Sequence, residues 1–108
     1  MAATAPTTAP VLALDIEKME KVAFILKTTA HPTRIGIVQL LAAHESLSVS
    51  ELCERLGGAE QSLTSHHLAT MKLKGLLGST RRGKHIYYSL KMREVVDVIQ
   101  CLAACTFL

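Results

Sequence analysis

The sequence contains no tryptophan, and its aromatic side chains are limited to two tyrosines and two phenylalanines. Aliphatic residues must therefore build the core, and the leucines, alanines and methionines among them favour helices. Hydrophobic residues make up 49% of the 108 residues, and a small domain buries only part of its surface by folding. We therefore expect one mainly helical domain that leaves apolar surface for a partner subunit.

Further absences exclude other classes of protein. No apolar stretch reaches the roughly 20 residues of a membrane span, so we expect no membrane partner. Residues 1–10 lack the basic start and apolar run of a secretory signal. We expect residues 1–14 to be a disordered tail, followed by a single domain over residues 15–108. The sequence contains three cysteines, an odd number, and we find no export signal in it. These two features predict reduced thiols in a cytoplasm.

The residue patterns that catalysis requires are missing as well. No nucleophile lies beside a base, and the sequence has no glycine-rich phosphate loop, no paired carboxylates and no complete zinc pattern. We therefore expect that the chain is not an enzyme.

Acidic residues are absent from residues 61–93, although residues 1–60 carry seven acidic and five basic groups. Natural surfaces usually mix both signs of charge, because a field of one sign is self-repulsive unless it attracts a ligand. An anionic membrane is a poor partner, since the segment alternates helix, turn and strand signals and forms no single basic amphipathic helix. Nucleic acid fits the segment better. Its basic residues are Lys72, Lys74, Arg81, Arg82, Lys84, Lys91 and Arg93.

Four helices are predicted in the first two thirds of the chain. Apolar residues at three- and four-residue steps predict a helix over residues 15–29, capped by Asp15, and a central one over residues 32–43. A capping box of Ser48 and Glu51 begins a short helix that ends at glycines 57 and 58. Another helix follows over residues 61–74. Two short helices joined by a glycine turn are typical of a helix-turn-helix.

The remaining residues predict a β-hairpin and a last helix. Leu76 and Leu77 begin the first strand, residues 81–84 supply the turn, and Ile86, Tyr88 and Leu90 alternate with polar residues to form one buried face. The helical period returns from Lys91 onward. Its apolar seam, which we expect a second copy of the chain to cover, consists of Val95, Val98, Ile99 and Leu102.

A helix-turn-helix places its second helix in the major groove of DNA. Helical geometry predicts that one side of residues 61–74 is core: Leu63, Thr64, His67, Leu68 and Met71. The opposite side should read base edges and phosphates, and it carries Gln61, Ser62, Ser65, His66, Ala69 and Lys72. At the hairpin tip, Arg81, Arg82 and Lys84 should contact the backbone or a neighbouring minor groove.

Residues 26–91 resemble the ArsR/SmtB family of bacterial winged helix-turn-helix repressors in the order of elements and in local motifs. The matching motifs are AHPTRI at residues 30–35, VSELC at 49–53, QSLTSHHL at 61–68, KGLL at 74–77 and RGKHIYYSL at 82–90. The resemblance implies a mainly α winged helix-turn-helix with about five helices and a hairpin wing. It also implies a homodimer joined through its first and last helices, repression of a palindromic operator in double-stranded DNA, release by an effector, and a bacterial cytoplasmic location.

The effector is less well indicated. Relatives with a thiolate site on the first helix of the helix-turn-helix carry two cysteines one residue apart, whereas here Glu54 and Arg55 follow Cys53. A site on the last helix would need histidine, and none follows His85. Cys101 and Cys105 remain, four residues apart and so expected on one helical face. They, with Cys53 as a weaker candidate, could take a soft metal, a metalloid, a persulfide or an oxidant; all three could instead be small buried hydrophobes.

Two other interpretations stay open. The chain could be a thiol-based metal or redox sensor without significant DNA binding, or a protein-interaction module that uses the winged fold as a scaffold. The sequence identifies no certain cofactor, and a soft metal or metalloid at the cysteines is the one possibility that it offers. His31, at the start of a helix, is expected to act as a cap rather than as a metal ligand.

Overall fold

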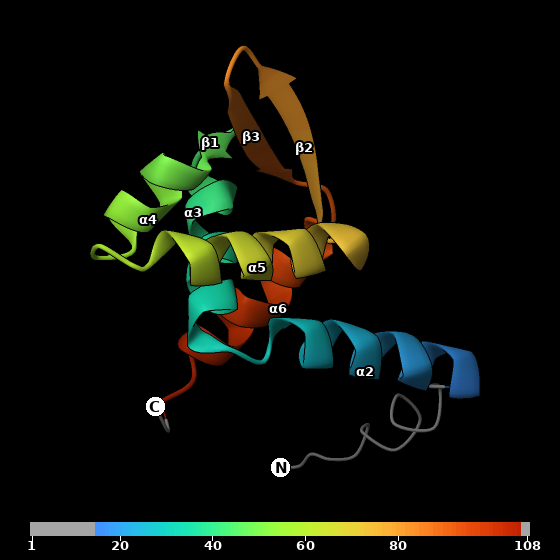
Figure 1. The fold of residues 1–108 in the computed structure, drawn as a ribbon. Coiled ribbons are helices and arrows are strands. Elements are labelled where there is room, and N and C mark those ends of the chain that lie inside the picture. The colour runs from blue at the N-terminus through green and yellow to red at the C-terminus, as the bar shows by residue number, and fades with distance from the viewer. Residues whose placement is uncertain (1–14, 107–108) are drawn as a thin grey trace.

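A computed structural model describes residues 15–106; the predicted disordered tail lies outside these residues. The described chain forms five helices and a three-stranded sheet (Figure 1), which confirms the predicted winged helix-turn-helix class. In chain order the elements are α2 (Ile16–Thr29), α3 (Pro32–Ala43), β1 (Leu47–Ser48), α4 (Val49–Arg55), α5 (Gln61–Leu73), β2 (Leu77–Arg82), β3 (His85–Leu90) and α6 (Glu94–Ala103).

Helices α2, α3 and α4 begin where a side chain satisfies a free amide of the first turn. The Asp15 carboxylate accepts from the Lys18 amide at 2.8 Å. His31 caps α3, as predicted, by accepting from the Thr33 amide through its Nδ1 atom at 3.2 Å. The capping box of α4 is complete: the Glu51 amide donates to the Ser48 hydroxyl at 3.2 Å, and the Ser48 amide donates to the Glu51 carboxylate at 2.9 Å.

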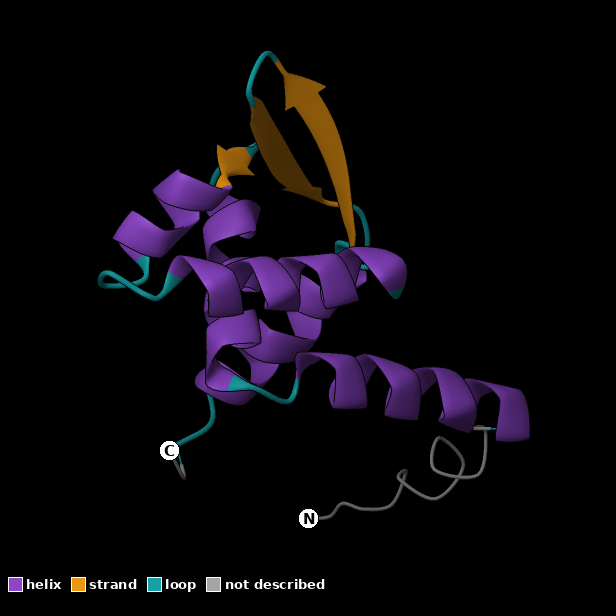
Figure 2. Cartoon of the chain, in the orientation of Figure 1, coloured by secondary structure: helices purple, strands orange, loops and turns teal. Residues whose placement is uncertain are grey.

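The core lies between α3, α5 and the base of the sheet. Ile37, Val38 and Leu41 place α3 at its centre, as predicted, and α3 packs against α5, α6 and β3. Figure 2 shows the helices gathered below the strands, with the hairpin projecting beyond them. The other core residues are Leu47, Leu52, Leu68, Met71, Leu76, Leu77, Tyr88, Leu90 and Val95.

The sheet has the order β1-β3-β2, and both pairings are antiparallel. Two details correct the sequence prediction. Arg81 and Arg82 belong to strand β2, so the turn is reduced to Gly83 and Lys84, with Gly83 in the left-handed region at φ 64°. Ile86 is 42% exposed rather than buried, because the hairpin extends past the helices that cover its base.

The end of the chain also differs from the prediction. Helix α6 begins at Glu94 and ends at Ala103, so Cys105 follows the helix and does not share a helical face with Cys101. Val95 is buried, whereas Val98 and Leu102 are exposed. Among residues 15–106, no helix is both long enough and apolar enough to cross a membrane.

Candidate nucleic-acid interface

A glycine turn sets the direction in which α5 leaves α4. Gly57 and Gly58 both have φ 81°, in the left-handed region that glycine adopts without a steric penalty. The amides of Gly58 and Ala59 donate to the carbonyl of Cys53 at 3.0 and 3.1 Å, which closes the turn. No side chain caps the start of α5, so its first amides have no side-chain partner. Such a helix start attracts phosphate.

The outward side of α5 carries the residues predicted to read DNA. Gln61, Ser62, His66 and Lys72 are exposed, and Ser65 is half-buried. The side facing the core carries Thr64, His67, Leu68 and Met71, all buried as predicted.

Leu63 is the exception, because it was predicted in the core and is 59% exposed. Residues on a helix are about 100° apart, which places Leu63 about a quarter turn from the middle of the buried arc formed by the other four residues. The periodicity that identified the buried side could not show where its edge lies, because that edge depends on how far α3 and α4 cover α5.

The hairpin of β2 and β3 is the wing, and it presents cationic side chains. Arg81, Arg82 and Lys84 are exposed. The Arg81 Nε–H donates to the Gly83 carbonyl at 3.3 Å, and the Arg82 guanidinium lies 5.0 Å from the centre of the Tyr87 ring. Both contacts limit the freedom of long side chains before any ligand binds.

A groove joins the wing to the helix-turn-helix. It is lined by Ser48, Val49 and Ser50 at the start of α4, Gln61 at the start of α5, and Lys84, His85 and Ile86 of the wing. The groove therefore connects the start of α5 to the tip of the wing. Ser50 and His85 line this groove and were not among the predicted site residues; the position of His85 next to Lys84 was the available signal in the sequence.

A partly buried polar cluster lies where α5 meets the junction of α2 and α3. The Arg34 Nε–H donates to His67 Nδ1 at 3.0 Å, and a second guanidinium nitrogen donates to the Thr28 carbonyl at 3.0 Å. The His31 and His67 rings lie 4.3 Å apart. Burial, together with the nearby positive charges of His31, Arg34 and His66, lowers the pKa of His67.

The cysteines lie in two places. Cys53 is buried in α4, whereas Cys101 is exposed on α6, and the Cys105 thiol donates to the Cys101 carbonyl at 3.4 Å. Figure 1 places α4 beside the wing and the end of α6 away from it. Over residues 15–106, no three His, Cys, Asp or Glu side chains are arranged to hold a metal ion.

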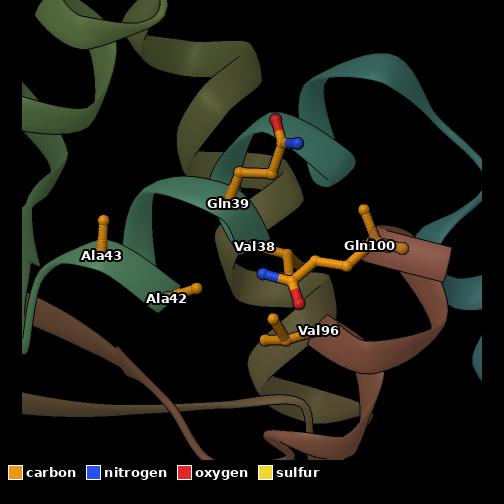
Figure 3. Close-up of a pocket in the computed structure, with 7 residues that line it drawn as sticks. Val38, Gln39, Ala42, Ala43, Val96 and Gln100 are labelled. Atoms are coloured by element: carbon orange, nitrogen blue, oxygen red, sulfur yellow. The ribbon is translucent and has the colours of Figure 1, made fainter. Parts of the chain in front are cut away.

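A hollow between α3 and α6 is lined by Val38, Gln39, Ala42, Ala43, Val96, Ile99 and Gln100. Figure 3 shows Gln100 reaching from α6 toward α3. No cysteine lines this hollow, so it provides no thiol site.

Comparison with known proteins finds helix-turn-helix transcriptional regulators. A family described as "Helix-turn-helix domain" matches residues 29–78. The HTH-type transcriptional regulator YgaV of Escherichia coli (strain K12) is 39% identical over 83 residues, which cover 77% of this chain and 83% of YgaV. The transcriptional repressor PagR of Bacillus anthracis is 37% identical over 89 residues, covering 82% of this chain and 88% of PagR.

Solved structures agree with these sequence matches. The crystal structure of PagR superposes with a TM-score of 0.70, covering 82% of this chain and 99% of PagR. The structure of HlyU from Vibrio cholerae N16961 superposes with a TM-score of 0.75 at 30% identity, covering 87% of this chain and all of the other. HlyU is named a transcriptional activator. Transcriptional repressors and activators therefore share this fold.

Proposed function

This chain belongs to the ArsR/SmtB-type winged helix-turn-helix transcriptional regulators, a family of DNA-binding proteins rather than enzymes, and from that premise we propose that it is a homodimeric repressor of a palindromic operator. Each subunit would place α5 in a major groove and its wing on the adjacent backbone or minor groove. The two copies of α5 would then lie about 34 Å apart, one turn of DNA.

The observation that carries the proposal is the continuous surface of α5 and the wing within an acid-free segment. Gln61 has the donor and acceptor groups that pair with adenine, and Ser65 and His66 can bond to base edges. Arg81, Arg82, Lys84 and Lys72 supply positive charge to phosphates, which accounts for most affinity but carries no sequence information.

Two exposed apolar stripes support dimerisation. Helix α2 extends from the body (Figure 1) and exposes Ile16, Met19, Val22 and Leu26. Helix α6 exposes Val98 and Leu102. Contiguous apolar surface of this kind marks an interface, and a second copy of the chain supplies a matching surface by twofold symmetry.

The proposed effector is a thiol-directed reagent that acts at Cys101 and Cys105. Exposure of Cys101 supports this assignment, and the hydrogen bond from the Cys105 thiol to the Cys101 carbonyl shows that the two cysteines lie close together. Reactivity requires an accessible thiol, which Cys53 does not offer because it is buried in the core.

The experiment that tests the function begins with duplexes enriched by the purified protein from a random-sequence pool. Fluorescence polarisation should show salt-dependent binding with two subunits per duplex, and the enriched sequence should be palindromic. A reporter carrying that sequence over its promoter should fall when the protein is expressed. Activation of the reporter would contradict repression, and failure to enrich any sequence would contradict the assignment of a specific operator.

A further inference from the structure

Arg34 joins three segments of the chain through one side chain. It leaves the first turn of α3, donates to His67 on the inner side of α5, and donates to the carbonyl of Thr28 in the last turn of α2. His67 is 8% exposed and Thr28 is 4% exposed. Water therefore competes little for either bond, and the bonds fix α5 against the α2–α3 junction.

The Arg34–His67 bond exists in one protonation state only. A guanidinium can donate but cannot accept, so His67 Nδ1 must carry a lone pair. The ring is therefore neutral, with its proton on Nε2. Protonation of Nδ1 would place two donors and two positive charges where one hydrogen bond now lies.

The surroundings of His67 offer no compensation for a positive charge. The charged or titratable groups that act on it are His31 and Arg34, from the end of the α2–α3 junction, and His66, from α5 itself. The His66 and His67 rings lie 6.1 Å apart. α5 also packs on α4 and β2, and neither contributes a charged group to this site within the described residues.

We propose that Arg34 is a positioning residue for DNA binding: its bond to neutral His67 holds the DNA-reading helix in place, and protonation of His67 releases that helix and weakens the complex. The inference rests on the proposed function, since α5 is the element that would enter the major groove. Ser65 and His66 directly precede His67 on the same turn, so a shift of the ring moves them. Thr28 belongs to α2, which carries one of the proposed dimer stripes. The Arg34 side chain therefore connects α5, the proposed DNA-reading helix, to α2, a proposed dimer helix.

The test compares the chain with three variants. His67→Asn keeps an acceptor at the position of Nδ1 but does not titrate. Arg34→Gln removes the positive charge and the guanidinium group that donates to both His67 and the Thr28 carbonyl. His44→Gln, at the end of α3 and outside this cluster, is the matched control for loss of a histidine.

Dissociation constants for an enriched duplex are measured at one salt concentration, at pH 8.0 and at an acidic pH where nitrogen-15 spectra show the His67 ring to be protonated. The native protein and His67→Asn share every other ionisable group, so the contribution of those groups cancels in the comparison. The ratio of the native dissociation constant to that of His67→Asn should rise roughly fivefold between the two pH values, the size of one net hydrogen bond. Arg34→Gln should bind roughly fivefold more weakly at pH 8.0, and His44→Gln should follow the native protein.

A second measurement does not depend on DNA. Nitrogen-15 spectra of the histidine rings should show His67 as the Nε2–H tautomer with a pKa below the ordinary value for histidine, and Arg34→Gln should change both properties. A His67 ring protonated on Nδ1 at neutral pH overturns the inference, as does an unchanged affinity ratio. If neither the native protein nor any variant binds a duplex, but the spectra show the Arg34–His67 hydrogen bond, the proposed function fails. The inference that this bond positions α5 is then retained.

Discussion

Gln61 at the start of α5 and Lys84 at the tip of the wing line the same groove, although a helix and a strand separate them in the chain. One side chain is suited to base edges and the other to phosphate. In the proposed complex with DNA, this arrangement would make sequence reading and attachment to phosphate parts of a single contact surface.

Neutralising the wing should weaken binding to every DNA sequence. Arg82→Gln with Lys84→Gln should lower the affinity about tenfold or more and reduce the slope of log affinity against log salt by about 2, since two phosphates would no longer be neutralised by a cationic side chain. The matched control is Lys91→Gln with Arg93→Gln, which removes the same charge between β3 and α6. Equal effects of the two pairs would show that net charge, not the wing, attracts the DNA.

Ser65 and His66 should determine which sequence is bound. Ser65→Ala with His66→Ala should lower affinity for the enriched duplex by about 1–3 kcal/mol for each base that is no longer hydrogen-bonded, while binding to random duplex changes little. Lys72→Gln, on the same side of α5, should weaken both equally. Competition between labelled specific and unlabelled random duplex measures the difference, and an unchanged specificity ratio would remove these two residues from the reading surface.

The stripe on α6 should hold the dimer together. Leu102→Glu places a charge in the proposed apolar interface and should convert the protein to monomers, with loss of binding to palindromic DNA. Gln100→Glu adds the same charge in the same helix, on the side that faces the hollow with α3, and should remain dimeric. Sedimentation or light scattering measures the mass of the particle in solution. A dimeric Leu102→Glu protein would show that the interface does not include this part of α6.

Cys101 and Cys105 should carry the response to thiol-directed effectors. Cys101→Ser with Cys105→Ser should keep its affinity for the enriched duplex but should no longer be released by arsenite or glutathione persulfide, because serine is not a thiolate nucleophile. Cys53→Ala should still respond, since that thiol is buried. Release of the double variant by both reagents would disprove the sensor assignment.

The capping box should contribute measurably to stability. Ser48→Ala removes the hydroxyl that accepts from the Glu51 amide and should lower the free energy of unfolding by about 1 kcal/mol. Ser50→Ala, an exposed residue on the same helix, should change it by less than about 0.5 kcal/mol. Urea unfolding followed by circular dichroism gives both free energies. Equal effects of the two substitutions would show that the capping hydroxyl of Ser48 does not stabilise the fold.

Much of the fold followed from local signals. The start of α3 at Pro32 and the box at Ser48 and Glu51 were predicted because caps act within one helical turn. The inner side of α5 was predicted by period, apart from Leu63, which lies at an edge that only neighbouring helices define. Strand β1 was not predicted, since two residues carry no period and pair only because β3 lies beside them.

The sequence by itself determined the family, the acid-free segment and the residues that α5 turns outward, because composition, helical period and caps depend on residues close together in the chain. Only the tertiary structure decided that Arg34 meets His67, that Gln61 and Lys84 share a groove, and that Cys105 falls beyond the last helix. These relationships join residues whose distance depends on how helices pack and where they end, and that packing is fixed by the whole core rather than by any one segment.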